Sequence, residues 1–169
     1  MSRYLILDGY NLIGALARYA TPSTGGLDES RELLVKDALN AAGWMGKKVI
    51  VVFDATQNLE PCRTEVRAGG VARVIYSGPK ESADDVIERL VKSLDEAATV
   101  CTADFSLQRA VLGYGAARST PREFEDLLDE LPAVVRTLDK PFRARFSDQL
   151  SPKTLRSLEE LRRRGEDSY

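Results

Sequence analysis

Four aspartates stand where the predicted strands and helices of this chain would bring acidic side chains together. Asp8, Asp54 and Asp104 each end, or closely follow, an apolar run typical of a buried strand, and Asp84 lies in the first turn of a predicted helix. Carboxylates gathered in one place repel one another unless a hard divalent cation neutralises them, and such cations prefer oxygen ligands. The pattern therefore predicts a site for Mg²⁺ or Mn²⁺ and for phosphate chemistry.

Polar neighbours of these aspartates could complete the site. Asn11 lies three residues after Asp8 and could hydrogen-bond a ligand water or a phosphate oxygen, so we group it with Asp8, Asp84 and Asp104 as catalytic. All four aspartates are expected to bind the metal. A further set, expected to support the ligands rather than to bind the ion, comprises Thr102, Ser106 and Asp85.

Each of these residues also has a purely structural explanation. Asp8 and Asp104 could cap the turns that follow their strands, and Asp84 could stabilise a helix start through the helix dipole. Ser106 could cap the helix that follows the last predicted aspartate. Asp85 points about 100° around the helix from Asp84, which makes it a poorer ligand. The joint occurrence of the four aspartates favours the metal site.

The elements that must position these residues alternate between strand and helix along the chain. Such alternation is typical of a parallel sheet covered by helices on both faces. The stretch Ala55–Gly70 is predicted to be irregular, because it contains two glycines, a proline and several charged residues. The predicted strands are Tyr4–Asp8, Val49–Asp54, Val71–Tyr76, Ala98–Thr102 and about Ala116–Arg118. The predicted helices cover residues 28–42, 82–97, 106–113 and 121–130, and a last one begins at Ser151-Pro152.

The strand order expected for this α/β sheet is 3-2-1-4-5. In open sheets of this kind, sites form at the carboxyl ends of the strands, near the point where the strand order reverses. The order sets the first and fourth strands side by side, so that Asp8 and Asp104 would face each other, with Asp54 one strand further on. Asp84 would approach from the start of its helix.

Composition limits the possible chemistry. At 169 residues, with 43% apolar and 30% charged residues, the chain is long enough for one main domain with a sizeable core. It contains no histidine, which excludes Ser-His-Asp and Cys-His catalysis and leaves acid–base work to carboxylates, lysine, tyrosine or metal-bound water. Cys62 and Cys101 match no metal or redox spacing, and Cys101 falls in a predicted buried strand.

The same features favour a reduced, cytoplasmic protein with no membrane association. No apolar run approaches the ~20 residues that span a bilayer, and the N-terminus enters a strand almost at once.

Charge is distributed unevenly along the chain. Residues 1–131 contain 15 Lys and Arg against 20 Asp and Glu, whereas residues 132–169 contain 9 against 6. A basic end beside an acidic body suits the binding of RNA, although a solvated helix with ion pairs explains it equally well. The candidate RNA-binding residues are Arg143, Arg145, Lys153, Arg156, Arg162, Arg163 and Arg164.

Several segments of the chain resemble the YacP-like group of NYN domains, which belongs to the PIN-like nuclease superfamily. They follow one another in the expected order over essentially the whole chain, and the most specific is the Asp-Gly-Tyr-Asn segment that begins at residue 8. The segments are Leu7–Ala15, Val51–Ala55, Ser82–Asp85, Thr102–Asp104, Gln108–Ala116 and Ser119–Leu127.

This resemblance implies a three-layer α/β/α PIN-like nuclease domain over residues 1–146, with a basic C-terminal helix or tail over residues 147–169. It implies a metal-dependent endoribonuclease, with acidic roles for Asp8, Asp54, Asp84 and Asp104 and with Asn11 and Asp85 nearby. The group includes a bacterial endonuclease that enters the ribosomal A site and cuts mRNA during translation. By that analogy, the partners are mRNA and the rRNA of the 70S ribosome. The chain is separately expected to be a monomer.

Two other classes of function stay open. A non-catalytic RNA- or ribosome-binding module would keep the fold and the basic end, and it would bind ribosomes equally well in EDTA. A phosphohydrolase of the haloacid-dehalogenase type also begins with an aspartate after a strand. That family needs a second aspartate two residues later, where this chain has Tyr10, so the residues disfavour it.

Overall fold

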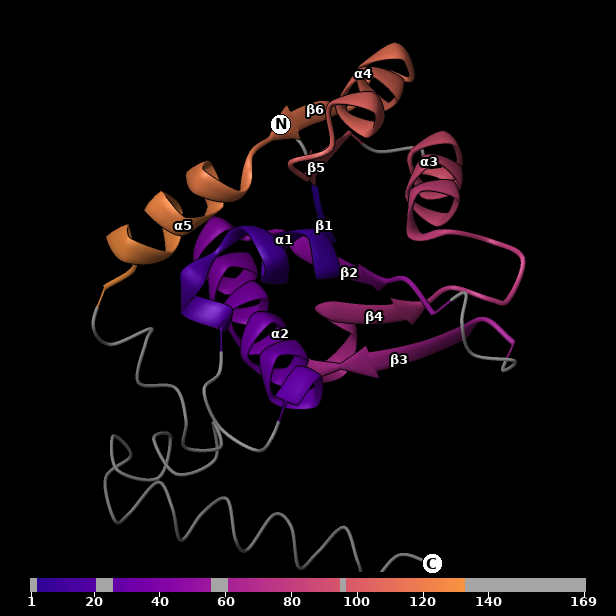
Figure 1. Cartoon of the computed structure of the whole chain (residues 1–169). Helices are drawn as coiled ribbons and strands as arrows, with labels where there is room; N and C mark the ends of the chain where they lie inside the picture. Colours follow the sequence, from indigo (N-terminus) through magenta and orange to yellow (C-terminus); the bar gives the residue numbers. More distant parts are fainter. Residues whose placement is uncertain (1–2, 21–25, 56–60, 95–96, 133–169) are drawn as a thin grey trace, which may run out of the picture. The chain divides into compact units, whose positions relative to one another are not determined.

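The computed structural model describes residues 3–20, 26–55, 61–94 and 97–132. They form a six-stranded sheet in the order β3-β4-β2-β1-β5-β6 (Figure 1). All neighbouring strands pair in parallel except β3 and β4, which are antiparallel. The strands are β1 Tyr4–Asp8, β2 Lys48–Phe53, β3 Arg63–Arg67, β4 Ala72–Tyr76, β5 Ala98–Cys101 and β6 Ala117–Ser119.

Helices cover both faces of this sheet, which makes three layers (Figure 1). The helices are α1 Gly9–Ala15, α2 Gly26–Met45, α3 Ala83–Ser93, α4 Phe105–Gly113 and α5 Pro121–Glu130, with short 3-10 turns at Ala17–Tyr19 and Ala68–Gly70. On one face, Ile6, Val52 and Val100 from the strands pack against Ile87 of α3 and Leu107 of α4. On the other face α2 packs against β2 and β4, and α1 and α5 lie beside α2.

The predicted fold class is confirmed, and so is the predicted strand order. The five predicted strands correspond to β1, β2, β4, β5 and β6, which follow one another in space as predicted. Alternating side chains of β1 and β2 are buried on both faces, which explains why these strands are almost entirely apolar.

One strand lies where the sequence predicts irregular structure. β3 (Arg63–Arg67) pairs antiparallel with β4 at the edge of the sheet, and the chain reverses through Gly69 and Gly70, which have φ values of 65° and 94°. Its Arg-Thr-Glu-Val-Arg sequence has no buried residue, so the alternation of apolar and polar residues that reveals a half-buried strand is missing. Hydrogen bonding to β4, rather than burial, makes this segment a strand.

Several other predicted boundaries differ from the structure. The chain enters α1 directly after β1, and the sequence does not predict this helix. The helix predicted over residues 82–97 ends at Ser93. The capping box predicted at the start of α5 is present, since Thr120 accepts the Glu123 N–H and Glu123 accepts the Thr120 N–H. The predicted helix from Ser151 and the predicted boundary at residue 146 lie outside the described residues.

Both cysteines are free, with Cys62 exposed and Cys101 buried as predicted. Burial raises the pKa of the Cys101 thiol to about 12, so that it stays protonated and unreactive. No helix in the described part of the chain is long and apolar enough to cross a membrane.

Gly9 allows the chain to pass from β1 into α1 without a loop. A Cβ atom at this position would lie 2.4 Å from two ring carbons of Phe53 and 2.9 Å from the carbonyl oxygen of Val52. Because Phe53 is fully buried, its ring has little room to move away. The glycine that follows Asp8 is therefore required by the close approach of β1 and β2.

We expect the Gly9→Ala variant to lose about 1–3 kcal/mol of folding free energy, because the added methyl group overpacks a buried ring. Urea denaturation followed by circular dichroism measures this loss. Gly14→Ala is the matched control in the same helix, since no atom lies within 4 Å of the Cβ position there. That variant should be unchanged or stabilised by about 0.5–1 kcal/mol. Equal stability of both variants would contradict the packing argument.

Candidate functional site

Three of the predicted site residues follow neighbouring strands at one edge of the sheet. β1 lies between β2 and β5, and all three strands are parallel. Asp8 ends β1, Asp54 follows β2, and Thr102 follows β5, so their side chains start from the carboxyl ends of the strands. The chain moves from β1 to β2 and β4 on one side, then returns to β5 and β6 on the other. Asp8 and Thr102 thus lie at the reversal of strand order, the position where open α/β sheets bind ligands.

Asp8 is the buried carboxylate of this edge, with 7% of its surface exposed. Its Oδ2 accepts a hydrogen bond of 2.8 Å from the Thr102 hydroxyl. The pKa of Asp8 is raised to about 6, chiefly by burial and further by repulsion from Asp84 and Asp104. The Thr102 hydroxyl and the backbone N–H of Asn11 act in the opposite direction by favouring the ionised form. Asp8 is therefore held in a position where its charge is costly.

Thr102 and Asn11 connect the two turns that flank the site. While the Thr102 hydroxyl donates to Asp8, it accepts the backbone N–H of Asp104 at 3.0 Å. The Asn11 Oδ1 accepts the backbone N–H of Ala103 at 2.7 Å, so the first turn of α1 is tied to the turn after β5. Both residues fix the relative positions of Asp8 and Asp104.

Gln108 belongs to the same network, although the sequence does not single it out as a site residue. Its side-chain amide donates to the backbone carbonyl of Thr102 at 2.7 Å, and it is buried beneath the turn. Arg118 of β6 in turn donates to Gln108 Oε1 at 3.4 Å. The signal available in the sequence is a polar residue at a helix position between Leu107 and Val111, where the core would favour an apolar one.

Asp104 is the N-cap of α4 and also one of the carboxylates that repel Asp8. Its Oδ1 accepts the backbone N–H groups of Ser106 at 2.7 Å and of Leu107 at 3.2 Å. The prediction that Ser106 could cap this helix is wrong: Asp104 caps it, and Ser106 contributes only its backbone N–H. An aspartate is preferred at this position because its short side chain reaches the free N–H groups of the first turn.

Asp84 and Asp54 approach the site from α3 and β2. The Asp54 Oδ2 accepts the backbone N–H of Ala83 at 3.3 Å, which ties the start of α3 to the end of β2. Partial burial raises the pKa of Asp84, and repulsion by Asp104 raises it further, followed by Asp85, Glu88 and, most weakly, Asp54. Because Asp8 is also repelled by Asp84 and Asp104, the four predicted aspartates form one electrostatic cluster.

Asp85, in contrast, is engaged in capping α3. Its carboxylate accepts the backbone N–H of Ser82 at 2.9 Å and the Ser82 hydroxyl at 2.8 Å, and the Ser82 hydroxyl accepts the Asp85 N–H. These hydrogen bonds lower the pKa of Asp85, which is exposed. Adjacent aspartates of one helix turn therefore differ in environment: Asp84 faces the acidic cluster and Asp85 closes the helix end.

The chemistry of this donor set suits a hard divalent cation, since it consists of carboxylate oxygens whose mutual repulsion a cation would relieve. Asp8, Asp84 and Asp104, whose charges repel one another, are the side chains that would hold such an ion. Asp54, the fourth predicted ligand, acts only weakly on Asp84 and is not among the groups that shift the pKa of Asp8. In the described part of the chain, no group of three or more aspartate, glutamate or cysteine side chains is placed closely enough to hold a metal as it stands. Closure around one ion would require side-chain movement of the more exposed members, Asp84 and Asp104.

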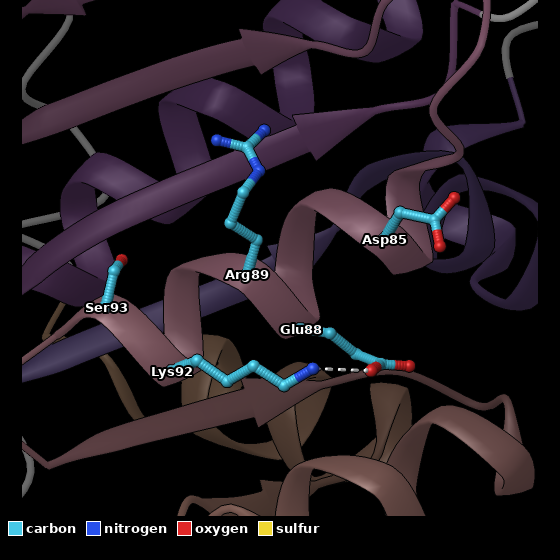
Figure 2. Close-up of a pocket in the computed structure, with 5 residues that line it drawn as sticks. All are labelled: Asp85, Glu88, Arg89, Lys92 and Ser93. Carbon is cyan, nitrogen blue, oxygen red and sulfur yellow. Dashed lines mark ion pairs between the residues drawn. The ribbon is translucent and has the colours of Figure 1, made fainter.

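An open pocket of about 450 Å³ on α3 lies outside this cluster (Figure 2). Glu88 and Lys92 pair with each other at 3.5 Å, and Arg89 pairs with Glu81 at 2.9 Å. The remaining lining carboxylate, Asp85, is engaged in capping α3 through Ser82, so each charged group of this pocket already has a partner in the protein.

The predicted RNA-binding residues all lie beyond residue 132 and outside the described residues. They are Arg143, Arg145, Lys153, Arg156, Arg162, Arg163 and Arg164.

Comparison with known proteins gives a consistent result over nearly the whole chain. A family model described as the YacP-like NYN domain matches residues 5–163. The protein YacP of Bacillus subtilis (strain 168) is 34% identical over 170 positions, which cover 94% of this chain and 96% of that protein. The crystal structure of Rae1 (YacP) from Bacillus subtilis is similar with a TM-score of 0.62 and 29% identity, over 98% of this chain and 97% of that chain. A substituted form of that protein gives a TM-score of 0.64 and 30% identity, over 78% of this chain and 77% of that chain.

The raised pKa of Asp8 predicts an effect on stability. Its pKa is about 6 in the folded state against 3.8 for an unperturbed aspartate, so ionisation opposes folding increasingly as pH rises from 3.8 to 6. In EDTA at pH 8, the Asp8→Asn variant should therefore be more stable than the parent by up to about 3 kcal/mol. Near pH 3.5 the gain should disappear. Urea denaturation at both pH values measures it.

Asp85→Asn is the control for which the opposite change in stability is expected, because the carboxylate of Asp85 has a lowered pKa and caps α3. This variant should be less stable than the parent at pH 8. Mg²⁺ should stabilise the parent but not Asp8→Asn. A loss of stability for Asp8→Asn at pH 8 in EDTA would contradict the costly buried charge.

Proposed function

Because the chain belongs to the YacP-like NYN domain family, whose members are PIN-like nucleases, we propose that it is a Mg²⁺- or Mn²⁺-dependent endoribonuclease that cuts mRNA in the ribosomal A site. The observation that carries this proposal is the buried Asp8, which lies at the reversal of strand order. Burial and repulsion by Asp84 and Asp104 destabilise the ionised form of its side chain. Carboxylates with raised pKa values gather at functional sites, and a divalent cation on an RNA phosphate is the partner that this cluster suits.

The roles of the residues follow from their contacts. Asp8, Asp84 and Asp104 would hold the ion, which supplies an activated water and stabilises the leaving oxygen. Thr102 keeps the Asp8 carboxylate in one orientation through its hydroxyl. Asn11 has its Oδ1 engaged by Ala103, so the group that it can offer to a phosphate oxygen is its NH₂ donor. With no histidine in the chain, proton transfer falls to these carboxylates or to metal-bound water.

The ribosome enters the proposal through the family and through charge. The nine Lys and Arg of residues 132–169 exceed the six acidic residues there, and such a segment can bind the phosphates of rRNA or mRNA. Translation places the protein in the cytoplasm, where single-stranded mRNA is presented in the A site. The match to the YacP-like NYN domain model extends to residue 163, so it takes in most of this basic segment.

A non-catalytic RNA-binding module is the second candidate function. One observation favours it: the described residues contain no group of three acidic side chains already placed to hold a metal. Such a module would bind ribosomes equally in EDTA and in Mg²⁺, and it would release no new RNA ends.

Asp84→Asn should reduce cleavage by about 100-fold or more, because a group of the reacting centre is lost while the fold is kept. The assay is cleavage of an mRNA on programmed 70S ribosomes, mapped by primer extension, beside naked RNA, with and without Mg²⁺. Asp85→Asn is the matched control. The Asp85 carboxylate is adjacent to Asp84 in the chain but caps α3, so this variant should cut at nearly the parental rate.

The outcomes separate the candidates. New ends that require ribosomes, metal and Asp84 support the proposal in full. Cutting of naked RNA alone supports a general PIN-like ribonuclease and removes the ribosome from the proposal. Full activity of Asp84→Asn would contradict the acidic site, and ribosome binding without any cutting would favour the binding module.

Thr102→Val tests the orientation of Asp8. The substitution keeps the shape of the side chain but removes the donor to Asp8 and the acceptor for the Asp104 N–H. We expect activity to fall about 10–100-fold, the range for partners that orient metal ligands. Because Thr102 lowers the pKa of Asp8, its loss should also move the acidic limb of the pH–rate profile to higher pH. A lower rate with an unmoved acidic limb would contradict this role.

A further inference from the structure

Phe105 is exposed to an unusual degree for a large aromatic residue beside a polar site. Its exposed fraction is 70%, the highest of the exposed large apolar side chains in the described part of the chain. It directly follows Asp104, a member of the acidic cluster, and it is the first residue of α4. An exposed apolar side chain on its own is common in proteins, so its surroundings decide whether it has a use.

Arg109 is the first relevant neighbour. It lies one helix turn after Phe105, and its guanidinium carbon is 6.0 Å from the centre of the phenyl ring. Among the described residues, Arg18, Arg31, Arg63, Arg67 and Arg89 all pair with carboxylates, whereas Arg109 does not. An aromatic ring and an unneutralised guanidinium thus lie together immediately beside the acidic cluster.

The helix turn that carries this pair is held rigidly. Asp104 accepts the N–H groups of Ser106 and Leu107, and Gln108 donates to the carbonyl of Thr102. Leu107 is buried in the core on the opposite side of the helix from the exposed pair. A rigid backbone with an exposed ring can bind a flat partner with little loss of conformational entropy.

We propose that Phe105 and Arg109 form a subsite for an unpaired nucleobase of the RNA. The base of a nucleotide beside the cleaved phosphate stacks on the Phe105 ring, and the Arg109 guanidinium contacts the stacked base or its phosphate. Aromatic rings stack on every base, and arginine adds cation–π and phosphate contacts. Because bases in a duplex are already stacked and paired, the subsite selects single-stranded RNA. This inference rests on the proposed function, which brings an RNA phosphate to the acidic cluster.

The test compares Phe105→Ala, Phe105→Tyr and Arg109→Ala in the full chain. Binding is measured with a single-stranded RNA that contains 2-aminopurine, whose fluorescence is quenched by stacking, in the Asp84→Asn background with Mg²⁺. Phe105→Ala should weaken binding about 10-fold and abolish the quenching, whereas Phe105→Tyr should keep both. In the otherwise unaltered protein, Phe105→Ala should raise KM for RNA cleavage by a similar factor with little change in kcat.

Leu112→Ala is the matched control, because Leu112 is 50% exposed on the same helix but a further turn from Asp104. It should leave binding and cleavage unchanged. Equal binding by Phe105→Ala and the parent overturns the subsite, even where Asp84→Asn abolishes cleavage and the nuclease itself stands. Equal weakening by Leu112→Ala also overturns it, since the effect would then belong to the helix. Phe105-dependent binding with no cleavage by the parent supports the subsite and overturns the proposed nuclease.

Discussion

The hydrogen bond from the Thr102 hydroxyl to the Asp8 carboxylate joins the two strands between which the order of the sheet reverses. The sheet offers an opening there, because the connections from β1 and from β5 leave on different faces. The same hydroxyl accepts the N–H of Asp104, so a single side chain sets the positions of two carboxylates. Asn11 and Gln108 hold the turn around it. The geometry of the acidic cluster therefore depends on this one contact and on the hydrogen bonds that hold the turn around it.

The electrostatics of this edge oppose the stability of the protein. Burial and the repulsion of Asp84 and Asp104 raise the pKa of Asp8 more than the hydrogen bonds of Thr102 and Asn11 lower it. At neutral pH Asp8 is thus ionised at a cost to folding that an asparagine would not incur. Asp54 and Asp104 offset part of this electrostatic cost, because they accept hydrogen bonds from backbone N–H groups at the starts of α3 and α4. Two of the four aspartates consequently stabilise helix ends and enlarge the acidic cluster at the same time.

The sequence predicts the parts of this fold that burial governs. β1, β2 and β5 are apolar because both of their faces are covered, so their ends, and with them Asp8, Asp54 and Thr102, could be located in advance. β3 could not, because an exposed edge strand needs only backbone pairing and leaves no apolar pattern. The capping role of Asp104 could be offered only as an alternative to metal binding, and the support by Gln108 could not be predicted, since it depends on a hydrogen bond to a backbone carbonyl whose position only the folded turn defines.

An acidic site that acts on RNA must obtain its affinity from somewhere other than its own charge. Residues 1–131 carry more acidic than basic residues, and the arginines near the sheet edge, such as Arg31 and Arg63, are paired with the protein's own carboxylates. Stacking of a base on Phe105 is little affected by this negative field, because it does not depend on attracting phosphate. The basic residues beyond position 132 can supply the long-range attraction. On the proposed function, attraction, base stacking and cleavage are thus divided among different parts of the chain, which lets the catalytic edge stay strongly acidic.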